Sequence, residues 1–432
     1  MLAGISSTSL ASGTVEDLKA GYTNQGWQVD HAVLQALAQA TDNQVYAAIS
    51  AAVRSVYLLW VEDSARYLQK LVTESGYPGG SLLTQQNDSS EEGQCMLFVD
   101  GLRFDTGKRL LELLIQDGFA VDESPAWAAL PSVTATGKAA VSPVRDKIRG
   151  EEGNIDFEPV VTTTGQSLKG GYHLKKLLSD NSWTVLERMD NDNGQGKGWF
   201  EFGDIDHEGH DRGWRLAKHV DSLLAEVRDR IASLLSAGWK SVRVVTDHGW
   251  LLMPQGLPKI DLPKTLTESK WGRCAVLKPG ASSDERLYPW YWNPNQYFAL
   301  ADGISCYKKG EEYAHGGLSL QECLVLHLSV TSPLTSTSSV SVEITDLVWK
   351  GLRCTVAVDG DYTGLSLDIR AQAGNFLSSL VVSVKQFKTN GTASVVIENE
   401  ELEGSIAEVV VIDENGEPVA QTTTTIGGST NA

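Results

Sequence analysis

The sequence predicts an α/β protein with a mainly parallel central sheet, a helical segment before it and an antiparallel β domain after it. Two apolar runs, Cys95–Val99 and Ser241–Val245, are each followed by a polar segment that contains aspartate. Such runs are typical of buried parallel strands, whose carboxyl ends carry the ligand-binding residues of α/β sheets. Helical spacing dominates before the first run, and short alternating runs dominate after residue 340.

The first 94 residues form the predicted helical segment. Apolar residues recur at spacings of three and four between His31 and Glu74, in two stretches that we interpret as two helices. The polar, turn-rich stretch Gly79–Gln94 then leads into the first strand. Because helices with an apolar face must bury it, this segment should contact the α/β core.

Residues 95–330 form the predicted central α/β domain. Thr106–Gln116 and Trp214–Ala237 have the apolar periodicity of helices, and Leu324–Val330 is a further strand. The stretch Ser142–Gly198 is rich in Gly, Asn and Asp, so we interpret it as an insertion or cap at about 142–198, beside the polar segments that follow the two strands.

The C-terminal part follows a Ser/Thr/Pro linker at Thr331–Ser339. This part covers 340–432, and over Val340–Gly428 it alternates apolar and polar residues in short runs, including SLVVSV at Ser379–Val384. Turn dipeptides such as Asp359-Gly360 and Asn390-Gly391 separate these runs, which predicts a sandwich-like antiparallel β domain.

Composition limits the classes of function and the cellular location. The net charge of −19 disfavours a protein that holds nucleic acid mainly through bulk electrostatics. Five cysteines without a CxxC pair predict reduced, buried thiols. No signal peptide and no stretch of membrane-spanning length is evident, so the expectation is a cytoplasmic protein that does not associate with a membrane.

Carboxylates and imidazoles gather after the predicted strands and in two further motifs. Asp100, Asp247 and His248 follow the strands, and Asp206 and His210 lie four residues apart, where a helix would place both on one face. His315 is followed by two glycines, which permit close backbone approach. Ligands of this mixed type suit Zn²⁺ or Mn²⁺ better than Mg²⁺ alone.

In chain order, the segments VDGLR, PSVT, DHEGH, TDHG and HGG resemble the motifs of the alkaline phosphatase superfamily. Longer stretches, including MLFVDGLRFDTGKRLLELL, ALPSVTATGKAAVSP and VVTDHGWLLMP, are similar to the PglZ family of BREX phage-defence systems. The resemblance spans roughly Cys95–Gly428. It implies an alkaline-phosphatase-like core, a trailing β domain and two divalent metal ions, Zn²⁺ or Mn²⁺.

The resemblance also implies the role of individual residues. One metal would be held by Asp206, His210 and His315. The second would be held by Asp100, Asp247, His248 and the hydroxyl of the nucleophile, Thr134.

Several alternatives remain open from the sequence. Ser132 and Thr136 are alternatives to Thr134 as the nucleophile, and all three hydroxyl residues could simply cap a helix. Asp204 and His207 offer another register for the DHEGH motif. Arg103 could contact a substrate phosphate bidentately or form a salt bridge with Asp105. Trp290 and Trp292 could line a pocket, although core packing suits them better.

The expected function is a metal-dependent phosphohydrolase, a phosphodiesterase that acts on nucleotides or nucleic acid within a BREX-type antiviral defence system. The alternative is a weakly active or inactive assembly component of the defence complex. The expected partners are a phosphoester substrate and other BREX proteins.

Overall fold

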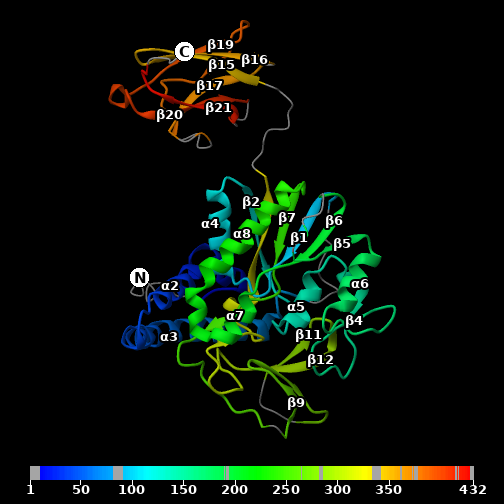
Figure 1. Ribbon diagram of the computed structural model, residues 1–432. Coiled ribbons are helices and arrows are strands. Elements are labelled where there is room, and N and C mark those ends of the chain that lie inside the picture. The colour runs from blue at the N-terminus through cyan, green and yellow to red at the C-terminus, as the bar shows by residue number, and fades with distance from the viewer. Residues whose placement is uncertain are drawn as a thin grey trace. The chain divides into compact units, whose positions relative to one another are not determined.

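The computed structural model divides the chain into two compact units, Met1–Pro333 and Leu334–Ala432, which are described separately (Figure 1). It describes all residues except 1–9, 81–90, 189, 191–193, 264, 282–285, 333–341, 361, 372, 374–377, 414, 415, 417 and 429–432. Most of the predicted linker Thr331–Ser339 therefore lies outside the described residues.

The first unit is built on a six-stranded mixed sheet with the order β2-β14-β7-β1-β6-β5. Its strands are β1 Gln94–Phe98, β2 Ala120–Trp127, β5 Trp183–Leu186, β6 Lys197–Glu201, β7 Ser241–Val245 and β14 Leu324–Thr331. Strands β7, β1, β6 and β5 pair in parallel, whereas β14 runs antiparallel to both β2 and β7. The strands predicted at Cys95–Val99 and Ser241–Val245 are confirmed as β1 and β7, and the predicted parallel character is interrupted by β14.

Helices cover the two faces of this sheet. Helices α4 (Phe104–Gln116) and α8 (Val220–Ser236) contact β14, β2 and β7 on one face. They put an apolar stripe, including Leu110 and Leu224, into the core. Helix α5 (Thr134–Val141) lies against the loop after β7, because a Cβ added at Gly137 would meet Asp247.

Two predictions for the central domain need correction. The helix expected over Trp214–Ala237 is a 3₁₀ helix, Gly213–Lys218, followed after His219 by α8. The stretch Ser142–Gly198 is more than an insertion, because it contributes β5 and the start of β6 to the central sheet. The same stretch holds the hairpin β3 (Ile148–Arg149) and β4 (Val160–Val161) and helix α6 (Tyr172–Asp180).

The N-terminal helices share a hydrophobic core with the sheet. They are α1 Val15–Gly21, a π-helical turn Tyr22–Gly26, α2 Trp27–Ala38 and α3 Asn43–Ser75. By length and composition α3 could cross a membrane, contrary to the sequence-based expectation, although a core helix of a soluble protein meets the same criterion. Its buried residues, such as Val53 and Leu68, belong to the core of the first unit.

Smaller elements complete the first unit. They include α7 Ile205–Arg212, α9 Leu320–Cys323, the strand pair β8 (Leu251–Leu252) and β13 (Tyr313–Ala314), and a four-stranded antiparallel sheet of β9 Thr267–Lys270, β10 Cys274–Leu277, β11 Leu287–Trp290 and β12 Asn293–Leu300. All five cysteines are free and buried, as expected.

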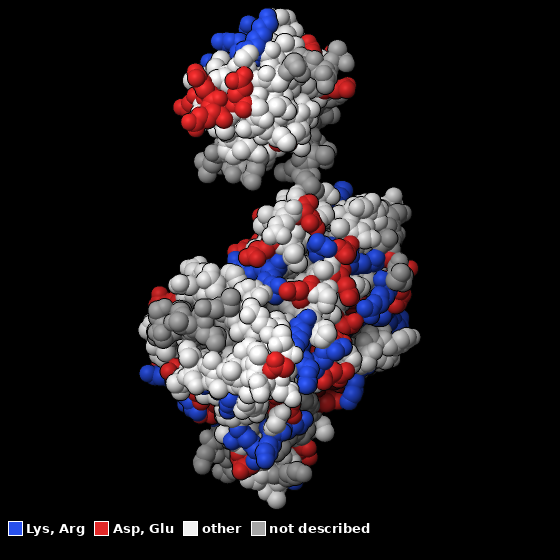
Figure 2. Space-filling view, turned by 60° about the vertical axis from the view of Figure 1, so that its left-hand side comes forward, with Lys and Arg blue, Asp and Glu red and all other residues white. Residues whose placement is uncertain are grey.

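The second unit consists of two antiparallel sheets around its own core. One sheet contains β15 Val342–Lys350, β16 Arg353–Gly360 and β19 Thr392–Val396; the other contains β17 Ser366–Arg370, β18 Lys385–Gln386, β20 Ile406–Ile412 and β21 Pro418–Thr425. The predicted strand Ser379–Val384 is reduced to two isolated bridges. Red carboxylate side chains gather on this unit in Figure 2, in keeping with the eight acids and no Lys or Arg after Lys388.

Candidate metal centre

The first group of polar side chains follows the two adjacent parallel strands β1 and β7. Asp100 comes directly after Val99, and Asp247 and His248 come after Thr246. Two backbone hydrogen bonds join the loops: the Leu102 N–H donates to Thr246 Oγ1 at 3.0 Å, and the Gly101 N–H donates to Asp247 Oδ1 at 3.3 Å. The loops therefore hold the three side chains at one edge of the sheet.

Helix α7 supplies Asp206 and His210 from one face. Gly101, at φ +68°, lets the β1 loop approach this helix, because a Cβ there would lie 3.0 Å from the Cβ of Asp206. Gly209 likewise lets the ring of Tyr313 pack against α7, because a Cβ at this position would lie 2.3 Å from that ring. Tyr313 donates its hydroxyl to Asp206 Oδ1 at 2.8 Å and so fixes the orientation of that carboxylate.

His315 lies in a loop that a buried ion pair holds in place. The Gly317 N–H donates to Glu322 Oε1 at 2.8 Å, and the buried Arg273 guanidinium donates to both oxygens of Glu322, at 3.0 and 2.8 Å. His315 Nδ1 lies 3.1 Å from the carbonyl oxygen of Ser132, so Nε2 faces the carboxylates. A positive φ of 104° at Gly316 permits this turn.

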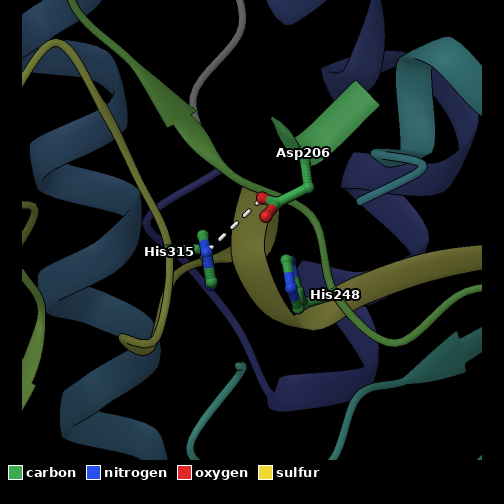
Figure 3. Close-up of side chains that lie close together, drawn as sticks. All are labelled: Asp206, His248 and His315. Atoms are coloured by element: carbon green, nitrogen blue, oxygen red, sulfur yellow. Dashed lines mark ion pairs between the residues drawn. The ribbon is translucent and has the colours of Figure 1, made fainter. Parts of the chain in front are cut away.

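Two sets of donor atoms converge at this edge, each with its atoms within 4.8 Å of one another. One consists of Asp206, His248 and His315, and the other of Asp100, Asp247 and His248. Asp206 and His315 point toward one another in Figure 3, with Oδ1 3.4 Å from Nε2. The ring of His248 stacks on that of His315 at 4.0 Å.

His210 completes the first ligand set implied by the resemblance. Its Nε2 lies 3.6 Å from Asp206 Oδ2 and 3.0 Å from His315 Nε2. It is the most exposed member, since 48% of its side chain is accessible. The structure thus brings together all six predicted carboxylate and imidazole ligands, with His248 between the two groups.

The electrostatics of the cluster favour a cation. Burial, and then the charge of Asp247, raise the pKa of Asp100 well above its usual value. Burial and the charge of Asp206 raise the pKa of Asp247 to about 7. Burial, and then His248, lower the pKa of His315, which favours the neutral, metal-binding form of its ring.

The residues fit divalent metal ions by a second criterion. Asp247 Oδ2 is buried and has no hydrogen-bond partner among the described residues, whereas Oδ1 accepts from two backbone N–H groups. A buried carboxylate oxygen without a donor is costly unless a cation faces it. Mixed imidazole and carboxylate donors suit Zn²⁺ or Mn²⁺.

The three candidate hydroxyls differ in their surroundings. Thr134, the first residue of α5, lies 3.3 Å from Asp100 Oδ1 and 3.1 Å from His248 Nε2. Ser132 is fully buried and donates to the Gly317 carbonyl oxygen. Thr136 is also buried and accepts from Trp290 Nε1 at 3.0 Å. Among these three hydroxyls, that of Thr134 is the one that contacts the donor cluster within the described part of the chain.

Arg103 does not lie among these residues. It is 1% exposed, and its guanidinium donates to both carboxylate oxygens of Asp105, at 2.6 and 2.9 Å. Its Cζ lies 3.8 Å from the ring centroid of Trp250. The salt bridge is therefore the alternative that the structure supports. It does not support a phosphate contact by Arg103, because the guanidinium is buried, paired with Asp105 and in contact with the ring of Trp250.

The residues of the alternative register of the DHEGH motif, Asp204 and His207, form ion pairs outside the donor cluster. Asp204 pairs with Arg188 at 3.1 Å, and His207 pairs with Asp211 at 3.4 Å with 73% of its side chain exposed. Trp290 and Trp292 are buried, and both indoles donate to Thr136, so they support α5 from the core.

Sequence reasoning missed Tyr313 and the Arg273–Glu322 pair. Each acts through a contact between distant parts of the chain, so no local pattern marks it.

A cavity of about 450 Å³ opens beside the cluster and is lined by Thr134, Asp206, His210 and His315 together with Trp271, Lys308 and Glu311, among others.

Of the comparisons with known proteins, the one with solved structures gives matches. No protein-family model matches the chain, and no curated protein matches it. Among solved structures, murine ectonucleotide pyrophosphatase/phosphodiesterase 5 matches at 13% identity and a TM-score of 0.37 over 55% of this chain and 88% of its own. An inactive variant of that murine protein in complex with AMP matches at 12% identity and a TM-score of 0.36, over 56% and 88%.

Proposed function

We propose that the protein is a metal-dependent phosphoric ester hydrolase, a phosphodiesterase that uses Thr134 as its nucleophile. One observation carries the proposal. The Thr134 hydroxyl lies within 3.3 Å of both Asp100 and His248, inside a cluster of carboxylates and imidazoles that suits divalent metal ions. An alcohol needs such surroundings, because it is a weak nucleophile at its ordinary pKa.

Two divalent ions, Zn²⁺ or Mn²⁺, are proposed to be held as the sequence resemblance implies. Asp206, His210 and His315 would hold one, and Asp100, Asp247, His248 and the Thr134 hydroxyl would hold the other. When bound, such ions stabilise an alkoxide and the negative charge that develops on a transferring phosphoryl group.

The chain's own residues position the reaction. Helix α5 presents the Thr134 oxygen to phosphorus, so that an O–P bond forms as the bond to the leaving oxygen breaks. The departing alkoxide takes a proton from solvent, and the hydroxyl proton of Thr134 passes to solvent. Water then cleaves the threonyl phosphate ester, which restores the hydroxyl and releases the phosphate product.

Nucleotides or nucleic acid are the proposed substrates. The cavity of about 450 Å³ is lined by an indole, Trp271, and a cation, Lys308, groups that can contact a base and a phosphate. The proposed setting is a BREX-type antiviral system in the cytoplasm, with other BREX proteins as partners. Support for that setting comes from the sequence resemblance to the PglZ family.

The test is hydrolysis of bis(p-nitrophenyl) phosphate by the purified full chain with Zn²⁺ or Mn²⁺, then with EDTA. We expect metal-dependent turnover that Thr134→Ala lowers by at least about 10³-fold. Thr164→Ala removes an exposed threonine of the first unit and serves as the matched control. Turnover that survives Thr134→Ala would refute the nucleophile assignment.

Absence of turnover would favour the alternative, an assembly component of the defence complex. The acidic second unit gives that alternative its support, because it provides a charged surface for docking. Metal analysis of the same samples separates the two cases. A folded chain that binds metal without hydrolysing mono- or diesters would be assigned to assembly.

A further inference from the structure

A second cavity, of about 300 Å³, lies on the sheet face opposite α4 and α8, at the strands β2, β14 and β7. Alternate residues along each strand line it: Ser124 and Ala126, Val325 and His327, and Arg243 and Val245. The register places His327 beside Ser124 and Val325 beside Ala126, so the six side chains form one surface. Leu326, between Val325 and His327, instead faces Gly107 of α4.

The far end of α5 covers this surface. Ala140 and Val141 of α5 and Arg145, just beyond it, line the cavity together with Trp127 at the end of β2. The cavity and the candidate metal centre thus lie at opposite ends of α5, whose first residue is Thr134. The two share no lining residue among those described.

The charge of the cavity differs from that of the chain. Two arginines and a histidine line it, and no Asp or Glu is among its described lining residues. The whole chain, in contrast, carries 55 Asp and Glu against 36 Lys and Arg. Guanidinium groups are suited to tetrahedral oxyanions, because their N–H groups match two oxygens at once.

A donor in the cavity wall lacks an acceptor. Trp127 Nε1 is buried and has no hydrogen-bond partner among the described residues. His327, which also lines the cavity, has Nε2 3.3 Å from the Thr246 carbonyl oxygen. Buried donors without acceptors in a protein commonly mark a site for water or an ion.

We propose that this cavity binds a small phosphate-bearing anion, held by Arg145 and Arg243 with Trp127 as a further donor. The site is separate from the metal centre and does not depend on the proposed hydrolase function. Its volume exceeds that of phosphate alone, so both inorganic phosphate and the phosphate group of a small sugar phosphate are candidate ligands.

Equilibrium dialysis of the full chain with labelled phosphate, and separately with ribose 5-phosphate, tests the proposal. EDTA is present throughout, so that binding through metal ions is removed. We expect saturable binding at one site, with a dissociation constant in the millimolar range or below. The ligand that binds more tightly shows whether the cavity takes free phosphate or a sugar phosphate. Arg243→Gln and Arg145→Gln should each weaken binding by about tenfold or more, because each removes a charge-assisted hydrogen-bond donor.

Two further variants keep the test decisive. Ala126→Leu fills the cavity without altering charge and should also weaken binding. Arg228→Gln removes an arginine from α8, on the opposite face of the sheet, and should leave binding unchanged. Absence of saturable binding by the wild-type chain, or equal losses in Arg228→Gln and Arg243→Gln, would overturn the proposal.

Discussion

At the scale of single residues, the candidate metal centre depends on groups that touch the ligands rather than on the ligands alone. Asp206 is the clearest case. Burial by itself would raise the pKa of this carboxyl, but His315, His248 and His210 lower it below its usual value. Tyr313 adds a hydrogen bond to the charged form. The aspartate is therefore kept ionised, as a metal ligand requires.

Removal of the Tyr313 hydroxyl should weaken metal binding. We expect Tyr313→Phe to lower Zn²⁺ affinity by about 10- to 100-fold, the usual cost of losing a group that orients a ligand. Competition with a chromophoric chelator measures the affinity. Tyr67→Phe removes an exposed hydroxyl that donates to the Gly13 carbonyl oxygen, away from the candidate ligands, and is the control. Equal affinities for Tyr313→Phe and wild type would show that Asp206 needs no such support.

At the scale of elements, a buried carboxylate fastens the N-terminal helices to the sheet. Asp30 of α2 accepts from Tyr22 at 2.7 Å, from Tyr57 of α3 at 2.5 Å and from Gln321 of α9 at 3.1 Å. Burial raises its pKa to about 6, despite the attraction of Arg103. Residues of the π-helical turn, α2, α3 and α9 thus meet at one acid.

This acid should make stability depend on pH. Its pKa of about 6 in the native state exceeds the ordinary value of 3.8, so between these values the native state binds more protons than the unfolded state. The free energy of unfolding should therefore fall as pH rises from about 4 to about 6, by at most about 3 kcal/mol from this group. Urea denaturation of wild type and Asp30→Asn in EDTA at several pH values measures the difference.

Asp30→Asn should be less stable at low pH and should lack this component of the pH dependence. Asp63→Asn, an exposed change on α3, should follow the wild-type profile. If wild type and Asp30→Asn change in parallel between pH 4 and 6, the assignment of the raised pKa to this carboxyl is wrong.

The Arg273–Glu322 pair fixes the loop that carries His315. Both side chains are fully buried, and Glu322 also accepts from the Gly317 N–H and the Ser319 hydroxyl. Arg273→Gln would leave a buried carboxylate without its cation, so we expect a loss of about 3–5 kcal/mol in the free energy of unfolding. Arg188→Gln, which breaks an exposed pair, should cost under about 1 kcal/mol. If Arg273→Gln lowers the free energy of unfolding as little as the control does, the Arg273–Glu322 pair does not stabilise the fold in this way.

How far the sequence predicts these elements depends on how local their signals are. Strand β1 is predictable because both of its faces are buried, which makes Cys95–Phe98 continuously apolar. Strand β7 gives a weaker signal, since the partly buried Ser241 and Arg243 interrupt its apolar residues. Strand β17 has a weaker local signal, because it carries Asp368 and Arg370, which form a buried ion pair at 2.8 Å. The run Ser379–Val384 looked like a strand, yet only isolated bridges form there, since alternation alone does not provide a pairing partner.

The residues of the candidate site are likewise predictable only where their sequence signal is local. The carboxyl ends of adjacent parallel strands must meet, so the convergence of Asp100, Asp247 and His248 could be expected from the sequence. The contact of Tyr313 with Asp206 could not be, because it joins residues 107 positions apart. Arg103 was ambiguous for a related reason: its partner, Asp105, is local, but its complete burial follows from the packing of Trp250 against it.

At the scale of the whole molecule, each unit has its own hydrophobic core. The core of the second unit includes Cys354, Val409 and Ile426, and the two cores share no residue among those that the structure describes. All the candidate metal ligands lie in the first unit. Eleven of the twelve tryptophans also lie there, and Trp349, which donates to Thr424 Oγ1 at 2.9 Å, is the one in the second.

The two units should therefore unfold as separate steps, and metal should stabilise only one of them. A ligand that binds the native state alone raises the free energy of unfolding, by about 2.7 kcal/mol at a concentration one hundred times its dissociation constant. We expect Zn²⁺ to shift the urea transition reported by total tryptophan fluorescence and EDTA to reverse the shift. The transition of Trp349, obtained as the difference between wild type and Trp349→Phe, should stay where it is. If Zn²⁺ instead shifts the Trp349 transition together with the transition of total tryptophan fluorescence, the two cores unfold as one cooperative unit. The units on either side of residue 333 would then not be independently stable.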